Sequence, residues 1–377
     1  MRSVLITGGA GFIGLSLTKK LVEAGYAIIS VDTLSEQIHG PKPSPEVIFG
    51  PIFDEIEFIE GDVRDRSLME SLMNRIDTVI HLAAETGTGQ SMYDIYKYSD
   101  VNIGGTSLLL DVLANTVNQV NRVIVASSRA IYGEGKYHCE NHGAQYPDSR
   151  RIDRLENLKF EHSCSFCDLE LVPLPTDEDS KLSPASIYGV TKCSQEQLTL
   201  AFCQSREISG FGLRFQNVYG PGQSLNNPYT GILSIFSSRI LQGLSINIFE
   251  DGLESRDFVF IDDVVDSIIK SIETDNLFVG PLNIGSGIPT DVLSVTNLLQ
   301  EKIGRTCDVE ITGQFRIGDI RHNFAALEKA KTVLQYEPKV SFEDGIGRYV
   351  SWVQEQKIST DNYELSLTEL RNRKLLR

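Results

Sequence analysis

The chain has 377 residues, of which 41% are hydrophobic and 23% are charged, a composition typical of a soluble globular protein with about two domains. Its formal net charge of −16 argues against nucleic acid or an anionic membrane as the main partner, because such surfaces bind a basic face. No apolar run approaches the roughly 20 residues of a membrane span and no secretory-signal pattern opens the chain, so we expect a cytoplasmic protein whose six cysteines form no disulfides.

Short β-rich runs alternate with amphipathic stretches through the first third of the chain. The β-rich runs predict strands at 3–7, 27–32, 57–63, 77–84 and 122–128. The amphipathic stretches predict helices at 12–25, 65–76 and 101–117. This alternation is typical of an α/β fold with a doubly wound parallel sheet, whose two faces are covered by helices.

The alternation stops after Tyr132, and about fifty residues without a clear period follow. A helix is expected at 183–206, with Ser183 as its N-cap and Pro184 near its start. A strand and loop at 211–221 precede a loop-rich stretch at 221–231. Residues 365–377 have the pattern of a basic amphipathic helix.

These patterns divide the chain into two predicted domains. Residues 1–215 form the first, which is interrupted by an insertion at about 134–182. Residues 216–377 form mainly a smaller α/β domain for substrate binding, from which the segment at about 257–290 returns to the first domain.

A glycine-rich loop joins the first predicted strand to the first helix, in the segment TGGAGFIG. Gly8 allows the tight turn, Gly11 lets a pyrophosphate approach the backbone, and Gly14 permits close packing of helix and strand. The helix N-terminus adds N–H donors and a positive dipole. Because the loop lies between a strand and a helix, it predicts a dinucleotide site; the alternative is a tight turn that binds nothing.

Asp32 ends the second predicted strand, 18 residues after Gly14. An acidic side chain at this point accepts hydrogen bonds from the adenosine ribose and repels a 2′-phosphate, so NAD is favoured over NADP. The alternative is that Asp32 only forms a turn. Asp62 and Val63 follow the third strand, where an adenine ring would lie.

Tyr188 and Lys192 lie four residues apart in the segment YGVTK, and therefore on one face of the predicted helix. Such a pair is common on solvated helices. Here it follows a dinucleotide loop and the strand end VASS, which can bring a hydroxyl to the same place. We therefore interpret the pair as catalytic.

Eight segments together are similar to the extended short-chain dehydrogenase/reductase family, in its nucleotide-sugar epimerase/dehydratase branch. They cover nearly all of residues 1–330: TGGAGFIG, GDVRD, HLAAETGTGQS, SSRAIYG, YGVTK, FQNVYGPG, ESRDFVFIDDV and RIGDIRH. The resemblance implies a Rossmann-type domain that binds NAD. The further cofactor contacts that it implies are Phe12, Ile13, Leu82, Ala83 and Ala84.

The resemblance also implies the catalytic roles. Ser128, four residues before Tyr132, matches the catalytic hydroxyl, Tyr188 the acid/base, and Lys192 the residue that binds the nicotinamide ribose. An unperturbed tyrosine has a pKa of about 10. The Lys192 ammonium and the nicotinamide cation would favour the phenolate and lower that pKa toward the operating pH.

Dehydratases of this branch carry Asp–Glu after the catalytic hydroxyl, where this chain has Arg129 and Ala130. Neither residue is a plausible acid for expelling a hydroxyl group, so epimerisation or simple reduction remains. An epimerase regenerates its NAD in every turnover, whereas a reductase would more often use NADPH, which Asp32 disfavours. The expected reaction is transient oxidation of the sugar at carbon 4.

Three residues match family positions that hold the nucleotide diphosphate: Asn217, Arg256 and Arg316. The planar fork of an arginine suits phosphate, although a single arginine is most often a surface charge. Thr88, Gln90 and Ser91 follow the fourth strand, where the family contacts the sugar. The expected partner is therefore a nucleotide-diphospho-sugar.

Two pairs of metal-ligand residues occur in the insertion. Cys139 and His142 form one pair, and Cys164 and Cys167 form the other. Four such ligands on two turns are typical of a structural zinc site, which would stabilise a segment with a poor core. The alternative is free thiols in a surface loop, and His138 and His162 are further candidate ligands.

The insertion also narrows the resemblance from the whole family to one group of its 4-epimerases. Its segments SSRAIYGEGKYHC and CSFC, with GDIRH, resemble the dTDP-L-rhamnose 4-epimerases, which interconvert dTDP-L-rhamnose and dTDP-6-deoxy-L-talose. A UDP-hexose 4-epimerase, a nucleotide 4-keto-sugar reductase and an NAD-sensing regulator are the alternatives. Family members commonly form homodimers, with the helices after VNIGG and around Tyr188 as the interface. Cys193 and Cys203 lie on the Tyr188 helix and are expected to be buried in the protein core.

Overall fold

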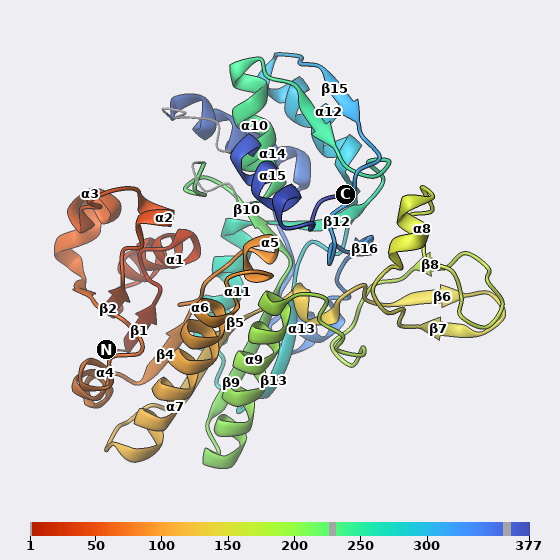
Figure 1. The fold of residues 1–377 in the computed structure, drawn as a ribbon. Coiled ribbons are helices and arrows are strands. Elements are labelled where there is room, and N and C mark those ends of the chain that lie inside the picture. Colours follow the sequence, from red (N-terminus) through yellow and green to blue (C-terminus); the bar gives the residue numbers. More distant parts are fainter. Residues whose placement is uncertain (1, 226–230, 357–362) are drawn as a thin grey trace.

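The computed structural model describes residues 2–225, 231–356 and 363–377 (Figure 1). Residues 226–230, within the predicted loop-rich stretch, lie outside the described part. A seven-stranded parallel sheet lies at the centre. Its strands, from edge to edge, are β13 (Val279–Ile284), β9 (Ser209–Phe215), β5 (Arg122–Ser128), β4 (Thr78–His81), β1 (Ser3–Thr7), β2 (Ala27–Asp32) and β3 (Glu57–Glu60). This order confirms the predicted doubly wound sheet.

Helices cover both faces of this sheet because successive side chains of each strand point to opposite sides. On β1, Val4 and Ile6 pack in the core beneath α1 (Phe12–Glu23) and α11 (Ile261–Glu273). Leu5 points the other way, into the second core. That face is covered by α4 (Arg66–Leu72), α7 (Gly105–Asn115) and α9 (Ile187–Arg206).

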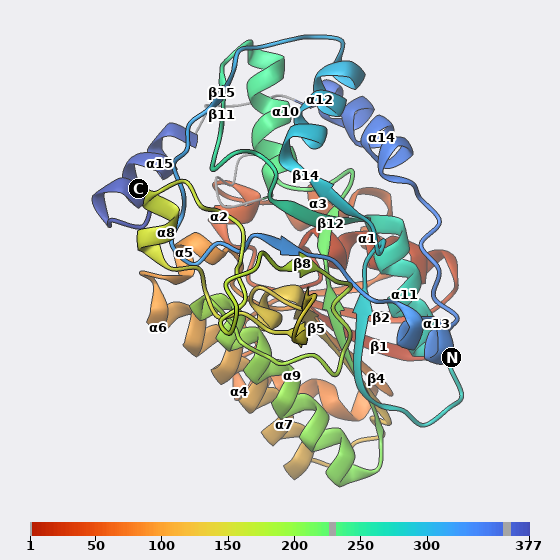
Figure 2. The ribbon, with the colours of Figure 1, turned by 90° about the vertical axis from the view of Figure 1, so that its right-hand side faces the viewer.

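A second region built around small sheets lies above the main sheet (Figures 1 and 2). Its strands are β10 (Asn217–Tyr219), β12 (Ser255–Phe260), β14 (Pro289–Asp291) and β16 (His322–Asn323), with β11 (Ile246–Ile248) paired to β15 (Val309–Ile311). Its helices are α10 (Ile232–Gln242), α12 (Val292–Ile303), α14 (Phe342–Glu355) and α15 (Tyr363–Asn372). Between β12 and β14 the chain returns to the main sheet through α11 and β13.

The predicted irregular segment folds into a small unit that projects to one side (Figure 1). It contains a three-stranded antiparallel sheet and one short helix: β6 (Tyr137–Cys139), β7 (Gly143–Gln145), β8 (Val172–Pro173) and α8 (Ile152–Glu156). Its own apolar cluster is small and includes three cysteines. The poor core expected from the sequence is therefore confirmed.

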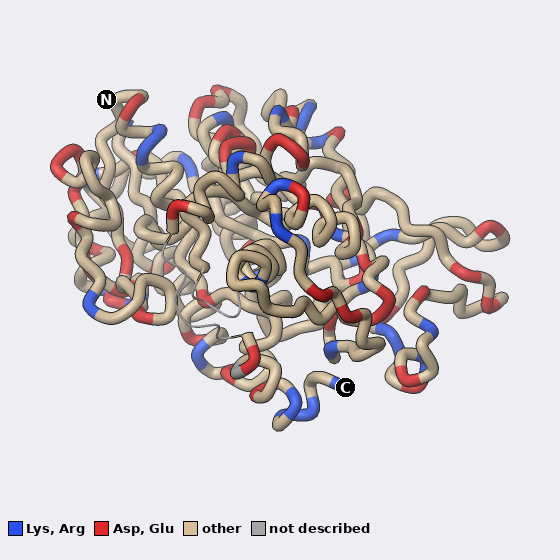
Figure 3. Tube along the Cα trace, turned by 90° about the horizontal axis from the view of Figure 1, so that it is seen from above, with Lys and Arg blue, Asp and Glu red and all other residues tan. Residues whose placement is uncertain are grey.

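Several short elements complete the structure. They are α2 (Glu36–His39), α3 (Pro45–Phe49), α5 (Thr88–Ser91), α6 (Ile95–Tyr98) and α13 (Glu328–Leu334), with 3₁₀ turns at Gly50–Glu55, Met73–Arg75 and Arg129–Tyr132. Acidic and basic residues are interspersed along the chain (Figure 3). Among the helices of the described residues, none combines the length and apolar character that crossing a bilayer requires.

Two helix starts differ from the prediction. Helix α9 begins at Ile187, and its N-cap is Ser186, whose hydroxyl accepts a hydrogen bond from the N–H of Gly189 at 3.1 Å. Ser183 instead donates its N–H to the carbonyl of Ile131, which keeps the chain extended before Pro184. The predicted helix at 101–117 is a π-helix over Ser99–Gly104 followed by α7.

Candidate active site

A cleft of ≈ 730 Å³ lies at the carboxyl ends of the central strands, between the main sheet and the second region. This is where doubly wound folds bind their ligands. All the predicted cofactor-binding residues line it: Gly8, Gly11, Phe12, Ile13, Gly14, Asp32, Asp62, Val63, Leu82, Ala83, Ala84, Tyr188 and Lys192. Ser128, Thr88 and Asn217 also line it.

The glycine-rich loop has the geometry that its sequence predicts. Gly8 has a φ of +73°, and a Cβ there would lie 2.7 Å from the backbone nitrogen of Ala83. A Cβ on Gly14 would lie 2.4 Å from the carbonyl oxygen of Gly8. Gly11 caps α1, and the first turn of that helix carries no acidic residue. The loop therefore presents N–H groups and a positive helix end to an anionic ligand.

Asp32 lies at the end of β2 and borders the cleft. Its carboxylate accepts hydrogen bonds from the N–H groups of Ala10 at 3.0 Å and Leu34 at 2.9 Å. These contacts fix the carboxylate while leaving each oxygen a second lone pair for a ribose hydroxyl. Together with the glycine-rich loop, this arrangement fits NAD.

The predicted catalytic residues meet at one wall of the cleft. Ser128 ends β5, while Tyr188 and Lys192 lie one turn apart on α9. Burial raises the pKa of Tyr188 above its usual value, and a hydrogen bond with Ser128 and the positive charge of Arg129 offset only part of this rise. The structure therefore corrects the expectation that Lys192 lowers this pKa.

Lys192 forms part of the cleft wall and is connected to a buried polar network. Burial lowers the pKa of Lys192 to about 7, and its Nζ donates to Oε1 of Gln195 at 2.8 Å. Gln195 in turn donates to Thr106 at 2.8 Å, and Thr106 lies 2.9 Å from Nε2 of His81. Burial lowers the pKa of His81 to about 3, so this histidine is neutral. We did not predict this network.

Two of the three predicted sugar contacts do not line the cleft. The fully buried Ser91 hydroxyl accepts the N–H of Tyr188 at 3.0 Å and donates to the carbonyl of Thr88 at 2.7 Å. It therefore supports the start of α9. The side-chain amides of Gln90 and Gln37 exchange two hydrogen bonds, of 3.0 and 3.2 Å. The spacing of the two predicted contacts after β4 could not reveal this, because their partners Tyr188 and Gln37 belong to other segments of the chain.

The two predicted phosphate-binding arginines lie beside the cleft. Arg256 is buried, and its Nη2 donates to Asp319 at 3.0 Å and to the carbonyl of Ile320 at 2.7 Å. Arg316 donates to the other oxygen of Asp319 at 2.8 Å. Arg129 itself lines the cleft, and its Nε donates to Oδ1 of Asn217 at 2.6 Å. We had considered Arg129 only as a residue that cannot act as an acid.

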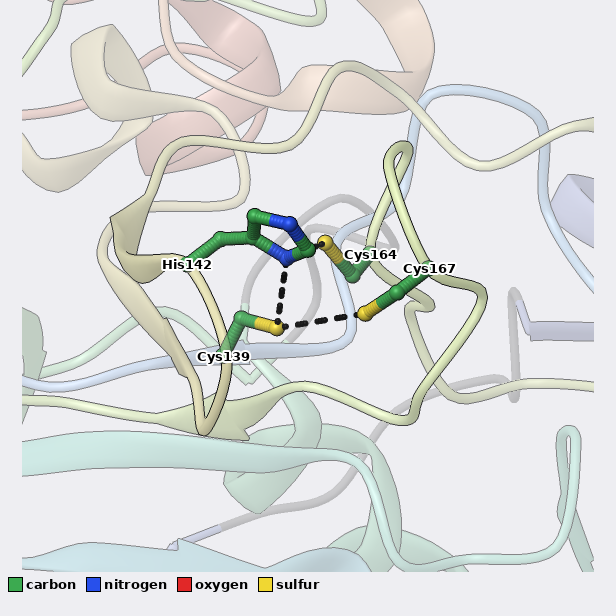
Figure 4. Close-up of side chains that lie close together, drawn as sticks. All are labelled: Cys139, His142, Cys164 and Cys167. Atoms are coloured by element: carbon green, nitrogen blue, oxygen red, sulfur yellow. Dashed lines mark hydrogen bonds between the residues drawn. The ribbon is translucent and has the colours of Figure 1, made fainter.

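The four predicted metal ligands converge in the projecting unit (Figure 4). Nδ1 of His142 lies 3.5 Å from the sulfurs of both Cys139 and Cys164, and the sulfurs of Cys139 and Cys167 are 3.6 Å apart. Zn–S bonds of about 2.3 Å and Zn–N bonds of about 2.0 Å in a tetrahedron give separations of about 3.5–3.8 Å. The donor set therefore fits a tetrahedral metal ion.

The other candidate ligands are oriented elsewhere. His138 is exposed on the opposite face of β6, and Nε2 of His162 lies 3.1 Å from the Glu134 carboxylate. The structure thus removes the ambiguity among the histidines. On α9, Cys203 is buried, as expected, whereas Cys193 is only half-buried.

Comparisons with known proteins agree with this site. A model of the NAD dependent epimerase/dehydratase family matches residues 4–151 and 158–285. The dTDP-L-rhamnose 4-epimerase of Burkholderia thailandensis is 34% identical over 357 residues, covering 94% of this chain and 96% of that protein.

Solved structures of similar proteins extend over the same length. The UDP-glucose 4-epimerase of Thermotoga maritima, determined with UDP-glucose, is 30% identical with a TM-score of 0.74, covering 94% of this chain and 99% of that one. The UDP-glucuronic acid 4-epimerase of Bacillus cereus, in complex with UDP-glucuronic acid and NAD, is 26% identical with the same TM-score and coverage. The chain therefore belongs to the NAD dependent epimerase/dehydratase family.

Proposed function

We propose that this protein is an NAD-dependent epimerase that inverts carbon 4 of a nucleotide-diphospho-sugar. The observation that carries the proposal is the meeting of Ser128, Tyr188 and Lys192 at one wall of a cleft whose other end has the geometry of a dinucleotide site. Dehydration is disfavoured because Arg129 and Ala130 occupy the positions of the acidic pair. The full catalytic set argues against a non-catalytic NAD-sensing regulator.

Each residue of the trio has a chemical task in this reaction. The Tyr188 phenolate removes the proton of the carbon-4 hydroxyl, and Ser128 donates a hydrogen bond to the oxygen that becomes a ketone. Lys192 in its protonated form supplies a positive charge beside the phenolate and the ribose. NAD, held by the glycine-rich loop and Asp32, would supply a reversible hydride acceptor for carbon 4. Rotation of the 4-keto sugar before the hydride returns exposes its other face and inverts the centre.

We further propose dTDP-L-rhamnose and dTDP-6-deoxy-L-talose as the sugar pair. The support is the similarity to the Burkholderia thailandensis protein over nearly the whole length of both chains. UDP-hexose 4-epimerisation is the second candidate, because the similar solved structures include enzymes with UDP-sugars. A nucleotide 4-keto-sugar reductase is the third, and Asp32 at the end of β2 disfavours the NADPH that a reductase would more often use.

The experiment that tests this function incubates the NAD-loaded protein with dTDP-L-rhamnose, and in parallel with UDP-glucose, and separates the products by chromatography. We expect dTDP-L-rhamnose and dTDP-6-deoxy-L-talose to reach the same mixture from either side, without net absorbance at 340 nm. Turnover of UDP-glucose alone would contradict the proposed substrate. Stoichiometric formation of NADH or consumption of added NADPH would contradict epimerisation.

We propose a structural zinc ion for the Cys139, His142, Cys164 and Cys167 cluster. The support is the donor set and its tetrahedral spacing, in a unit whose apolar core is small. A catalytic role is disfavoured because all four positions around the metal would be filled by protein. Binding of the ion would add directly to the folding free energy of this unit.

Replacing Cys164 by serine is expected to remove the zinc and to lower Tm by roughly 5 °C or more, since 1 kcal/mol corresponds to about 2–4 °C in a domain of 150–250 residues. Elemental analysis and thermal unfolding of the purified protein measure both effects. Cys307→Ser is the control, because this half-buried cysteine lies outside the cluster. Metal-free wild-type protein with an unchanged Tm would contradict the zinc site.

We also propose a cytoplasmic homodimer with an α7–α9 interface. Val190 and Leu198, both on α9, are 44% and 38% exposed, which is unusual for large apolar side chains of a long helix. Burial against a second copy would remove this apolar surface from water. The domain division expected from the sequence, with 1–215 binding NAD and 216–377 mainly binding the sugar nucleotide, is part of the same proposal.

A further inference from the structure

Arg129 lies beside the proposed reaction centre. It directly follows Ser128, in the 3₁₀ turn after β5, and it lines the cleft together with Tyr188. Its positive charge offsets part of the rise in the pKa of Tyr188 that burial causes. No step of the epimerisation described above uses this side chain.

Among the described residues, the guanidinium of Arg129 forms a hydrogen bond through its Nε only. Its Nε donates to Oδ1 of Asn217 at 2.6 Å. Within residues 2–225, 231–356 and 363–377, neither Nη1 nor Nη2 has a hydrogen-bond or ion-pair partner. The bond to Asn217 orients the planar fork, and four N–H donors remain for a ligand in the cleft.

The charges around Arg129 favour an anionic ligand. Arg256 and Arg316 share the single carboxylate of Asp319, so the three arginines face one firmly ionised acid. The arginines, Arg129 among them, hold the pKa of Asp319 well below its usual range. Burial and the neighbouring Arg256 lower the pKa of Arg129 to about 10, so it remains a cation at neutral pH.

The other nearby carboxyl groups have their own partners within the protein. Asp257 accepts hydrogen bonds from Ser286, Gly287 and Ala325 through both of its oxygens. Burial raises the pKa of Glu254 to about 7, so this carboxyl is only partly ionised at neutral pH. Among the described residues neither carboxyl bonds to Arg129, so its two Nη groups stay available to an anionic ligand.

We propose that Arg129 is a substrate-binding residue whose two Nη groups hold the sugar-bearing phosphate of the nucleotide sugar. This deepens the proposed function and rests on it. Arg129 lines the cleft together with Ser128 and Tyr188, which act on carbon 4. Its Nε bonds to Asn217, which is expected to hold the diphosphate. The phosphate that joins the sugar to the nucleotide would occupy this intermediate position. A planar fork binds two phosphate oxygens at once, which sets the distance from the phosphate to the reacting carbon.

The test compares nucleotides that differ by this phosphate. Binding of dTDP and dTMP, and of UDP and UMP as a second pair, is measured by calorimetry with NAD-loaded wild-type, Arg129→Met and Arg129→Lys proteins. We expect Arg129→Met to weaken binding of the better diphosphate about 10- to 100-fold, as charged hydrogen bonds worth about 1.5–3 kcal/mol imply, and to leave the monophosphate nearly unchanged. Arg129→Lys should recover part of the loss, because it keeps the charge without the fork.

Unchanged NAD affinity shows that each variant is folded. Equal binding of the diphosphate by wild-type and Arg129→Met proteins would overturn the assignment, even if KM for the nucleotide sugar rose, because the contact would then be with the sugar. An equal loss for the monophosphate would also overturn it. Failure of the wild-type protein to bind either diphosphate would instead contradict the proposed function itself, and the two failures are therefore distinguishable.

Discussion

Tyr188→Phe is expected to lower kcat about 10²- to 10⁴-fold while NAD remains bound. The substitution removes only the phenolic oxygen, and general-base catalysis by a positioned side chain contributes typically 10²–10⁴-fold. The aromatic ring still fills the wall of the cleft, and the N–H of residue 188 still donates to Ser91. The dinucleotide-binding loop lies on other elements and is not altered. Turnover is measured by chromatography of the nucleotide sugars, and retained NAD by absorbance after release.

A matched substitution separates this effect from a general loss of structure. Tyr96→Phe removes the same atom from a side chain that is 81% exposed, and its turnover should equal that of the wild-type protein. Full activity of Tyr188→Phe would refute the acid/base role. Loss of NAD together with activity would indicate that the phenol mainly positions the cofactor.

Arg321→Met is expected to cost about 3–5 kcal/mol of folding free energy, because it leaves the buried carboxylate of Glu250 and the half-buried carboxylates of Glu161 and Asp251 without this cation. Arg321 is fully buried. Its guanidinium donates to Glu161 at 2.7 Å and to Asp251 at 2.7 Å. Glu161 belongs to the projecting unit and Asp251 to the second region, so this arginine joins the two. Urea denaturation monitored by circular dichroism measures the change.

The control for Arg321 is an arginine with an exposed partner. Arg151 pairs with Asp153 at 2.8 Å, and both side chains are more than 60% exposed. Exposed pairs contribute about 0–1 kcal/mol, so Arg151→Met should leave the denaturation midpoint nearly unchanged. Similar midpoints for the two variants would contradict the role of Arg321 as the joint between the units.

Backbone features of the cofactor site could be predicted because local sequence determines them. Gly8 and Gly14 are required wherever a strand turns tightly into a closely packed helix. Asp32 lies at a strand end, and its position relative to the loop follows from the parallel pairing of β1 and β2. The spacing of Tyr188 and Lys192 places them on one helix face in any structure that keeps the helix.

Side-chain partners across the fold could not be predicted. Ser91, Arg256 and Arg316 have residue types that suit a substrate, yet their polar atoms bind Tyr188 and Asp319. Arg129 looked like a residue that merely lacked acidity, and only its contact with Asn217, 88 residues later, orients it in the cleft.

Local sequence patterns predict the α/β class, the dinucleotide loop, the acidic strand end, the Tyr–Lys pair and the four clustered metal-ligand residues. These depend on spacings of a few residues, which local backbone geometry converts directly into positions in space. Which polar groups face the cleft, and which form hydrogen bonds within the protein, depends instead on the folded arrangement. That choice depends on contacts between segments far apart in the chain, where each buried donor or acceptor must find a partner that its own neighbours do not specify.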